Sequence, residues 1–122
     1  MDDLVAFLRA RLDEDEKLAR DVIAEREEYP QGPRRHTTRY PFPARNARAL
    51  HDGIHGPERV LREVEAKRRI VEGCVESLER EARRDYVTEG GDNDSAVLAR
   101  FTLRMLALPY ADHPEYRDEW KP

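Results

Sequence analysis

The feature that most constrains the fold is an apolar repeat in the middle of the chain. Pro57 suits the first position of a helix, where its missing N–H group loses no hydrogen bond. The positions that follow are 3, 4, 3, 4 and 3 residues apart, and five of the six are apolar: Leu61, Val64, Arg68, Val71, Val75 and Leu78. This spacing aligns side chains along one side of a helix. It predicts a helix over about 57–84 whose heptad-like face packs inside the protein or against a second copy.

Two further helices are predicted, one on each side of this repeat. Residues 2–28 combine strong helix formers with apolar residues at helical spacing, and Pro30 lies just beyond them. Residues 94–108 begin with Asp94 and Ser95, either of which can cap a helix, and they stop before Pro109. One face of this last helix collects large apolar residues: Val97, Leu98, Phe101, Met105 and Leu108. Three helices joined by non-periodic segments predict an all-α fold, a small three-helix bundle.

Composition limits the core of this bundle. Leu, Ile, Val and Phe make up 25 of the 122 residues, while 39% of the residues are charged, which is close to the level at which chains remain unfolded. The length suits one domain, so we expect a single helical domain over 1–122, with an irregular loop over 29–50 and a tail over 109–122. The absence of a signal-peptide pattern and of a long apolar run favours a cytoplasmic location.

The loop over 29–50 is basic in a chain whose net charge is −4. It carries five arginines and no acidic residue: Arg34, Arg35, Arg39, Arg45 and Arg48. Guanidinium groups interleaved with Tyr29, Tyr40 and Phe42 could neutralise phosphates while the rings stack on exposed bases. This pattern raises nucleic-acid binding as one hypothesis. We favour a loop folded over the acidic first helix, or a solvated arm, because no nucleic-acid-binding motif accompanies the arginines.

Histidine and aspartate residues suggest a second hypothesis, a divalent-metal site. The candidate ligands lie before the central helix and in the tail: His51, His55, Asp112 and His113. Imidazole and carboxylate groups can hold zinc or another divalent ion, and an open coordination position would activate water for hydrolysis. The spacing does not match an H-E-x-x-H helix, and Gly53 and Gly56 interrupt a continuous helix there. Histidines that bond to the backbone or cap helices are the commoner outcome.

The tail over 109–122 concentrates aromatic surface. Pro109 and Pro114 forbid a continuous helix, and the segment carries Tyr110, Tyr116 and Trp120. These rings either close the thin core as a structural clasp, which we favour, or dock on a protein partner or a second copy. The single cysteine, Cys74, falls within the apolar pattern of the central helix and is expected to be a buried thiol rather than a reactive one.

Three blocks of the sequence carry a family resemblance: MDDLVAFLRARLDEDE at the start, the segment from His51 to Val71, and LALPYADHPEYRDEWKP at the end. Together they resemble a family of small proteins, a domain of unknown function, common in Streptomyces and other actinobacteria and in their phages. That family usually has an aspartate where this chain has Gly56, and a tryptophan-containing segment in place of the arginine loop. The resemblance implies no catalytic residue or cofactor, and it directs attention to the matching blocks.

These observations favour a non-enzymatic interaction or regulatory module that binds a protein partner or itself. The enzyme alternative is a divalent-metal-dependent hydrolase that uses His51, His55, Asp112 and His113. The nucleic-acid alternative uses the arginines between Arg34 and Arg48.

Overall fold

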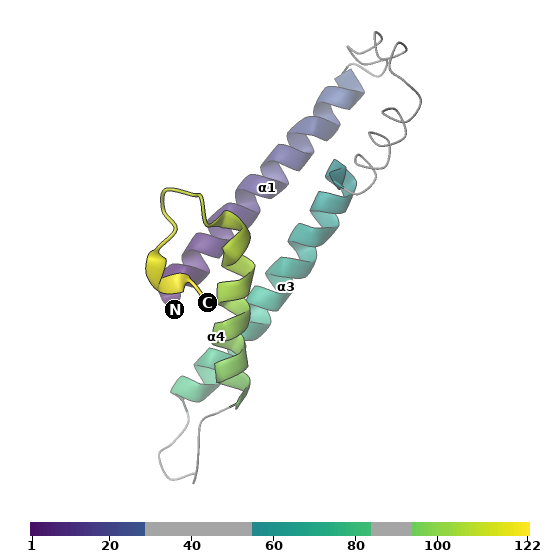
Figure 1. Ribbon diagram of the computed structural model, residues 1–122. Coiled ribbons are helices and arrows are strands. Elements are labelled where there is room, and N and C mark those ends of the chain that lie inside the picture. The colour runs from purple at the N-terminus through teal and green to yellow at the C-terminus, as the bar shows by residue number, and fades with distance from the viewer. Residues whose placement is uncertain (29–54, 84–93) are drawn as a thin grey trace, which may run out of the picture. The chain divides into compact units, whose positions relative to one another are not determined.

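A computed structural model describes residues 1–28, 55–83 and 94–122, and these residues form three α-helices followed by short helical turns (Figure 1). The helices are α1 (Asp2–Glu28), α3 (Pro57–Ala82) and α4 (Asp94–Ala107), and the 3₁₀ turns are η2 (Leu108–Tyr110) and η3 (Asp118–Trp120). The described residues contain no strand. The prediction of an all-α, three-helix bundle is confirmed, with helix bounds within two residues of those expected. The predicted loop over 29–50 lies outside the described residues.

The described residues group into two compact units, one of Met1–Leu12 with Ala66–Pro122 and the other of Asp13–Glu65. The first unit contains the largest of the fully buried side chains: Leu4, Leu8, Leu12, Val71 and Leu103. The three leucines of α1 recur at every fourth position, so they form one stripe along the helix. Val71 belongs to the heptad-like face of α3, which therefore serves the core of its own chain.

Helix α4 packs through small side chains. Its buried residues are Ala96, Ala99, Leu103 and Ala107, which recur at spacings of three and four along one face. Small side chains let a helix backbone approach its neighbours closely, because interaxial distance follows side-chain size. The larger apolar residues that the sequence groups on this helix lie on another face, described below.

In the second unit, the described residues bury Ala19 and Val64 and carry ion pairs on their surface. Arg26 near the end of α1 reaches Glu58 at the start of α3, with 2.5 Å between Nη1 and Oε1. A hydrogen bond from the backbone at Glu58 and then the Arg26 guanidinium lower the pKa of the Glu58 carboxyl below its usual range. The carboxylate also suits the positive end of the helix dipole. Pro57 is the first residue of α3, as expected.

The described helices are not membrane-spanning candidates, because none combines the length and apolar character that a bilayer requires.

Candidate functional site

The C-terminal tail closes on α1 through an aromatic clasp, which consists of Phe7, Tyr110, His113, Tyr116 and Trp120. The Phe7 ring centroid lies 5.0 Å from that of Trp120, 6.0 Å from Tyr116 and 6.3 Å from Tyr110. The two tyrosine rings meet Phe7 edge to face, an arrangement that aromatic pairs favour. Trp120 is buried, with 6% of its surface exposed. Trp120 is therefore part of the core of its own chain, and the half-buried Tyr110 and Tyr116 pack around the same phenylalanine.

Consecutive turns carry the tail around Phe7. Backbone N–H groups of His113, Tyr116 and Trp120 each donate to the carbonyl three residues earlier, at 2.9 to 3.0 Å. Pro109 and Pro114 have no N–H group to extend these turns into an α-helix. The chain consequently changes direction several times, and residues spaced unevenly in sequence reach one phenylalanine.

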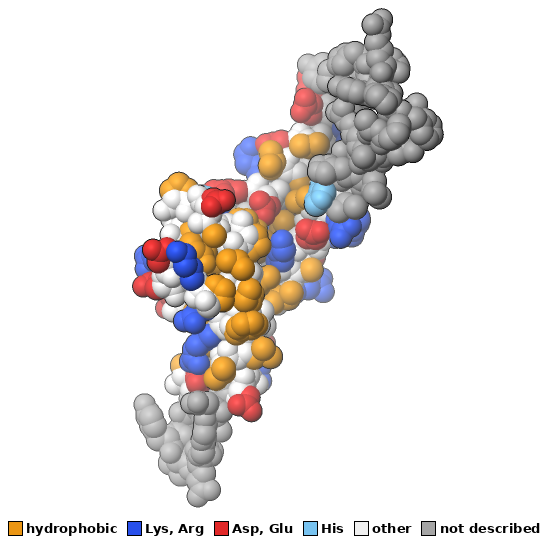
Figure 2. All heavy atoms as spheres, in the orientation of Figure 1, with side chains coloured by type: hydrophobic (Ala, Val, Ile, Leu, Met, Phe, Trp, Pro, Cys, Tyr) orange, Lys and Arg blue, Asp and Glu red, His pale blue; other side chains and the backbone are white. Residues whose placement is uncertain are grey.

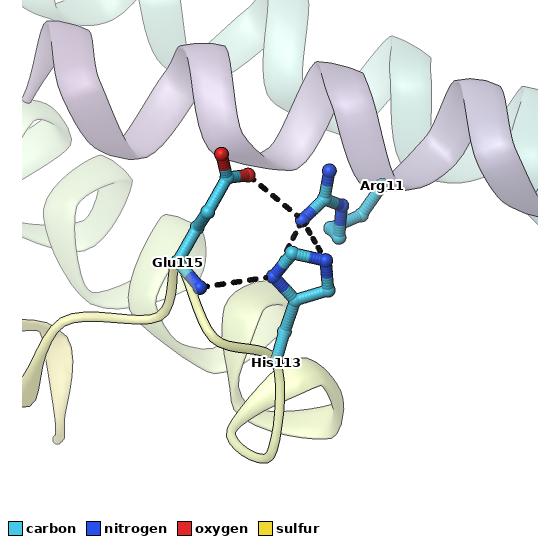
Figure 3. Close-up of polar contacts among 3 residues, drawn as sticks. All are labelled: Arg11, His113 and Glu115. Atoms are coloured by element: carbon cyan, nitrogen blue, oxygen red, sulfur yellow. Dashed lines mark hydrogen bonds and ion pairs between the residues drawn. The ribbon is translucent and has the colours of Figure 1, made fainter.

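A buried arginine lies beside this clasp (Figure 3). The Arg11 side chain is only 6% exposed, and its Nη1 lies 2.7 Å from Nδ1 of His113 and 3.2 Å from Oε2 of Glu115. The Arg11 guanidinium also stands 5.1 Å from the centroid of the Phe7 ring, within cation–π range. The backbone N–H of Glu115 donates to Nδ1 of His113 at 3.1 Å. Arg11 Nη1 also contacts Nε2 of His113, so the guanidinium group lies against both ring nitrogens.

Charged side chains hold the outside of the clasp. Arg117 Nη1 lies 2.8 Å from Oδ2 of Asp3, and the Arg117 guanidinium is 5.4 Å from the Trp120 ring centroid. Lys121 hydrogen-bonds to Asp118, which lowers the pKa of Asp118 and raises the pKa of Lys121. Pairs exposed to water contribute little free energy. Their contribution here is to orient the last turn over the buried tryptophan.

A second apolar surface lies on α4 and the residue after it. We call it the α4 outer face; it consists of four exposed residues, Val97, Leu98, Phe101 and Leu108, and the half-buried Met105, with Leu108 as the first residue of η2. The exposed fraction of the residue is 63% for Leu98, 55% for Phe101, 50% for Val97 and 41% for Leu108. In Figure 2 hydrophobic side chains gather in a band over α4. The sequence correctly groups these residues on one face, but the helix buries its alanine face and leaves this one outside.

Polar groups near the α4 outer face already have partners. The Thr102 hydroxyl donates to the carbonyl of Leu98 at 2.8 Å, and Arg100 pairs with Glu81 of α3. A groove of 830 Å³ beside the N-terminus is lined by Val5, Arg9, Val75 and Leu78, among other residues. Its Arg9 is held by Glu72 at 2.8 Å. The α4 outer face therefore presents apolar groups beside a paired arginine, whereas the groove is also lined by the acidic residues Asp2 and Glu79.

The predicted metal ligands are distributed over both units. Asp112 and His113 lie in the tail, His55 precedes α3 in the second unit, and His51 lies outside the described residues. In the part of the chain that the structure describes, no three His, Cys, Asp or Glu side chains are grouped to hold a metal ion. His113 contacts Arg11 and the backbone of Glu115. The metal site stays a prediction, because His51 is not described.

The predicted nucleic-acid residues, from Arg34 to Arg48, all lie outside the described residues. Cys74 is free and buried, as predicted, and burial raises the pKa of its thiol. Two residues of this region were not predicted: Phe7 in the clasp and Arg11 beside it. A signal for both exists in the sequence, because Arg11 follows Leu4, Phe7 and Leu8 at helical spacing and so lies on the apolar stripe of α1.

The described helices, a buried arginine and a tail that packs on α1 identify a small all-α protein. The sequence matches DUF6221, a family of unknown function, over residues 1–122, and the chain belongs to that family. The resemblance to a domain of unknown function is thereby confirmed. No curated protein and no solved structure matches the chain.

Proposed function

We propose that this protein is a non-enzymatic interaction module and that the α4 outer face binds its partner. The observation that carries the proposal is the exposure of Leu98 and Phe101, each more than half exposed. In a chain with so few large apolar residues, leaving them in water forgoes stabilisation of about 1.5–3 kcal/mol for each side chain that could be buried. Contiguous exposed apolar patches of about 300–600 Å² commonly mark interaction sites.

The surroundings of this face support an apolar partner surface. None of its five residues is charged. The nearby Arg100 is neutralised by Glu81, and the Thr102 hydroxyl is bonded to the helix backbone. A partner that covered the face would strip water from few unpaired polar groups, so the loss of hydration would cost little.

In this proposal the predicted partner-binding aromatics position the face rather than touch the partner. Tyr110 belongs to η2, which follows α4 directly, and its ring packs on Phe7 of α1. Tyr116 and Trp120 hold the rest of the tail on the same phenylalanine. The clasp therefore anchors the C-terminal end of α4. The resemblance of the three sequence blocks to actinobacterial and phage proteins supports such a host for the module.

Site-specific photocrosslinking tests the proposal with a matched pair of leucines. Leu98 on α4 is 63% exposed and Leu18 on α1 is 66% exposed, so a benzophenone amino acid is equally accessible at either position. After irradiation of cells that make the protein, we expect a discrete adduct from position 98, absent from position 18 and lost when Phe101→Glu is added. Absence of a discrete adduct at position 98, or the same adduct at both positions, would contradict the proposal.

A further inference from the structure

We infer that the partner of the α4 outer face is a second copy of this chain, bound with the two α4 helices antiparallel. The inference rests on the proposed function, since it names the occupant of the same face. Its starting point is the spacing of Leu98, Phe101, Met105 and Leu108, which is 3, 4 and 3 residues. This order reads the same in both directions, and it runs from α4 into Leu108, the first residue of η2.

A symmetric spacing suits a two-fold axis. If the two-fold axis crosses the α4 outer face at the level of residue 103 along the helix, Leu98 of one copy faces Leu108 of the other. Phe101 then faces Met105. The reciprocal contacts are then identical, as an isologous interface requires. The four residues span ten positions, or about 15 Å of helix at 1.5 Å per residue. Antiparallel helices also place opposite ends of their dipoles side by side.

Charge favours the same occupant. The five residues of the α4 outer face are uncharged, and one basic residue, Arg104, borders them at helical spacing from Phe101 and Leu108. Charged side chains of a partner would lose hydration against the five uncharged residues without gaining an ion pair from them. An identical face brings five uncharged residues to the same contact. Another apolar protein surface is the alternative that the experiment below separates from a second copy.

The exposed area predicts a weak, reversible dimer. The four exposed residues of the face together present roughly 400 Å² of surface on each copy, the size of a typical functional patch: Val97, Leu98, Phe101 and Leu108. Two copies would bury about 800 Å² in this central contact, so the whole interface falls in the transient class below about 1,200 Å². The heptad-like face of α3 is less available for this purpose, since its Val64 and Val71 are already buried.

Sedimentation equilibrium of the purified full chain tests self-association. We expect the average mass to rise with concentration from one chain toward two, with half-association at micromolar concentrations of about 1–100 μM, as interfaces of this size allow. Leu98→Glu should weaken the dimer at least ten-fold, whereas Leu18→Glu, at a leucine of equal exposure, should leave it unchanged. Circular dichroism of each variant reports folding, and Phe101→Ser serves if Leu98→Glu does not fold.

Cysteine pairing tests the antiparallel register. In a Cys74→Ser background, chains carrying Leu98→Cys are mixed with chains carrying Leu108→Cys and oxidised with copper phenanthroline. The inference expects the mixed 98–108 disulfide to exceed the 98–98 disulfide several-fold. A preference for 98–98 would overturn the antiparallel arrangement.

The two proposals fail in different ways. A monomer at every concentration up to about 1 mM, far above the affinity range of transient interfaces, overturns self-association. If position 98 then still gives a photo-adduct with a different protein, the interaction module stands and only its partner changes. If neither self-association nor an adduct is found, both proposals fall.

Discussion

The aromatic clasp and the α4 outer face both contain large apolar side chains, but the clasp buries its tryptophan and the α4 outer face leaves its phenylalanine exposed. In the clasp, Trp120 is 6% exposed and packs 5.0 Å from Phe7. On α4, Phe101 is 55% exposed. The difference follows from which surfaces the chain can bring together. The rings of the tail pack on Phe7 of α1, whereas α4 packs into the core through its alanine face. Apolar character thus identifies both regions, whereas only packing separates a core from a docking surface.

The largest effect that would test this difference is the removal of the clasp tryptophan. We expect Trp120→Ala to lower the free energy of unfolding by about 3–5 kcal/mol, because it deletes a buried ring and leaves a cavity beside Phe7. Phe101→Ala is the matched aromatic control, and it should change stability by no more than about 0.5 kcal/mol at concentrations where the chain is monomeric. Urea denaturation followed by circular dichroism measures both. Equal losses would show that the α4 face is also part of the core.

Arg11 should give the next largest effect. Arg11→Ala removes a buried cation together with its contacts to His113 and Glu115, and leaves their hydrogen-bonding groups without this donor. We expect a loss of about 2–3 kcal/mol in the free energy of unfolding. Arg11→Met, which keeps most of the volume against Phe7, should recover part of this loss. If methionine were as damaging as alanine, the polar contacts rather than the packing would carry the stabilisation.

The Tyr116 hydroxyl should give the smallest effect and one of opposite sign. It is buried and has no hydrogen-bond partner among the described residues, although its ring packs on Phe7 and Trp120. Tyr116→Phe keeps these ring contacts and removes the polar group, so we expect stability to stay level or to rise by about 0.5–1 kcal/mol. Thermal unfolding is sensitive enough to detect this. A loss greater than 1 kcal/mol would show that the hydroxyl is bonded in solution.

The sequence predicted the helices well because local rules determine them. The apolar repeat from Leu61 to Leu78 and Pro57 before it locate α3. The capping candidates Asp94 and Ser95 mark the start of α4, and Pro109 follows its end. The clasp was predicted only in part: the tail aromatics were recognised, while Phe7 and Arg11 were not. A contact across 102 residues, such as that between Arg11 and His113, leaves no periodic signal in a single sequence. The contact between Arg11 and His113 forms only when the tail packs on α1, so it is seen in the tertiary structure alone.

By itself, the sequence determined the three amphipathic helices found among the described residues, the interruption of helix in the tail, and the burial of Cys74. Those properties follow from spacing, from proline geometry and from apolar patterning, all of which act over a few residues. Only the tertiary structure decided which apolar face of α4 turns inward. Both faces are apolar, so hydrophobicity does not choose between them, and the choice depends on how closely the helix must approach its neighbours. The alanine face allows the closer approach, and Leu98 and Phe101 remain exposed.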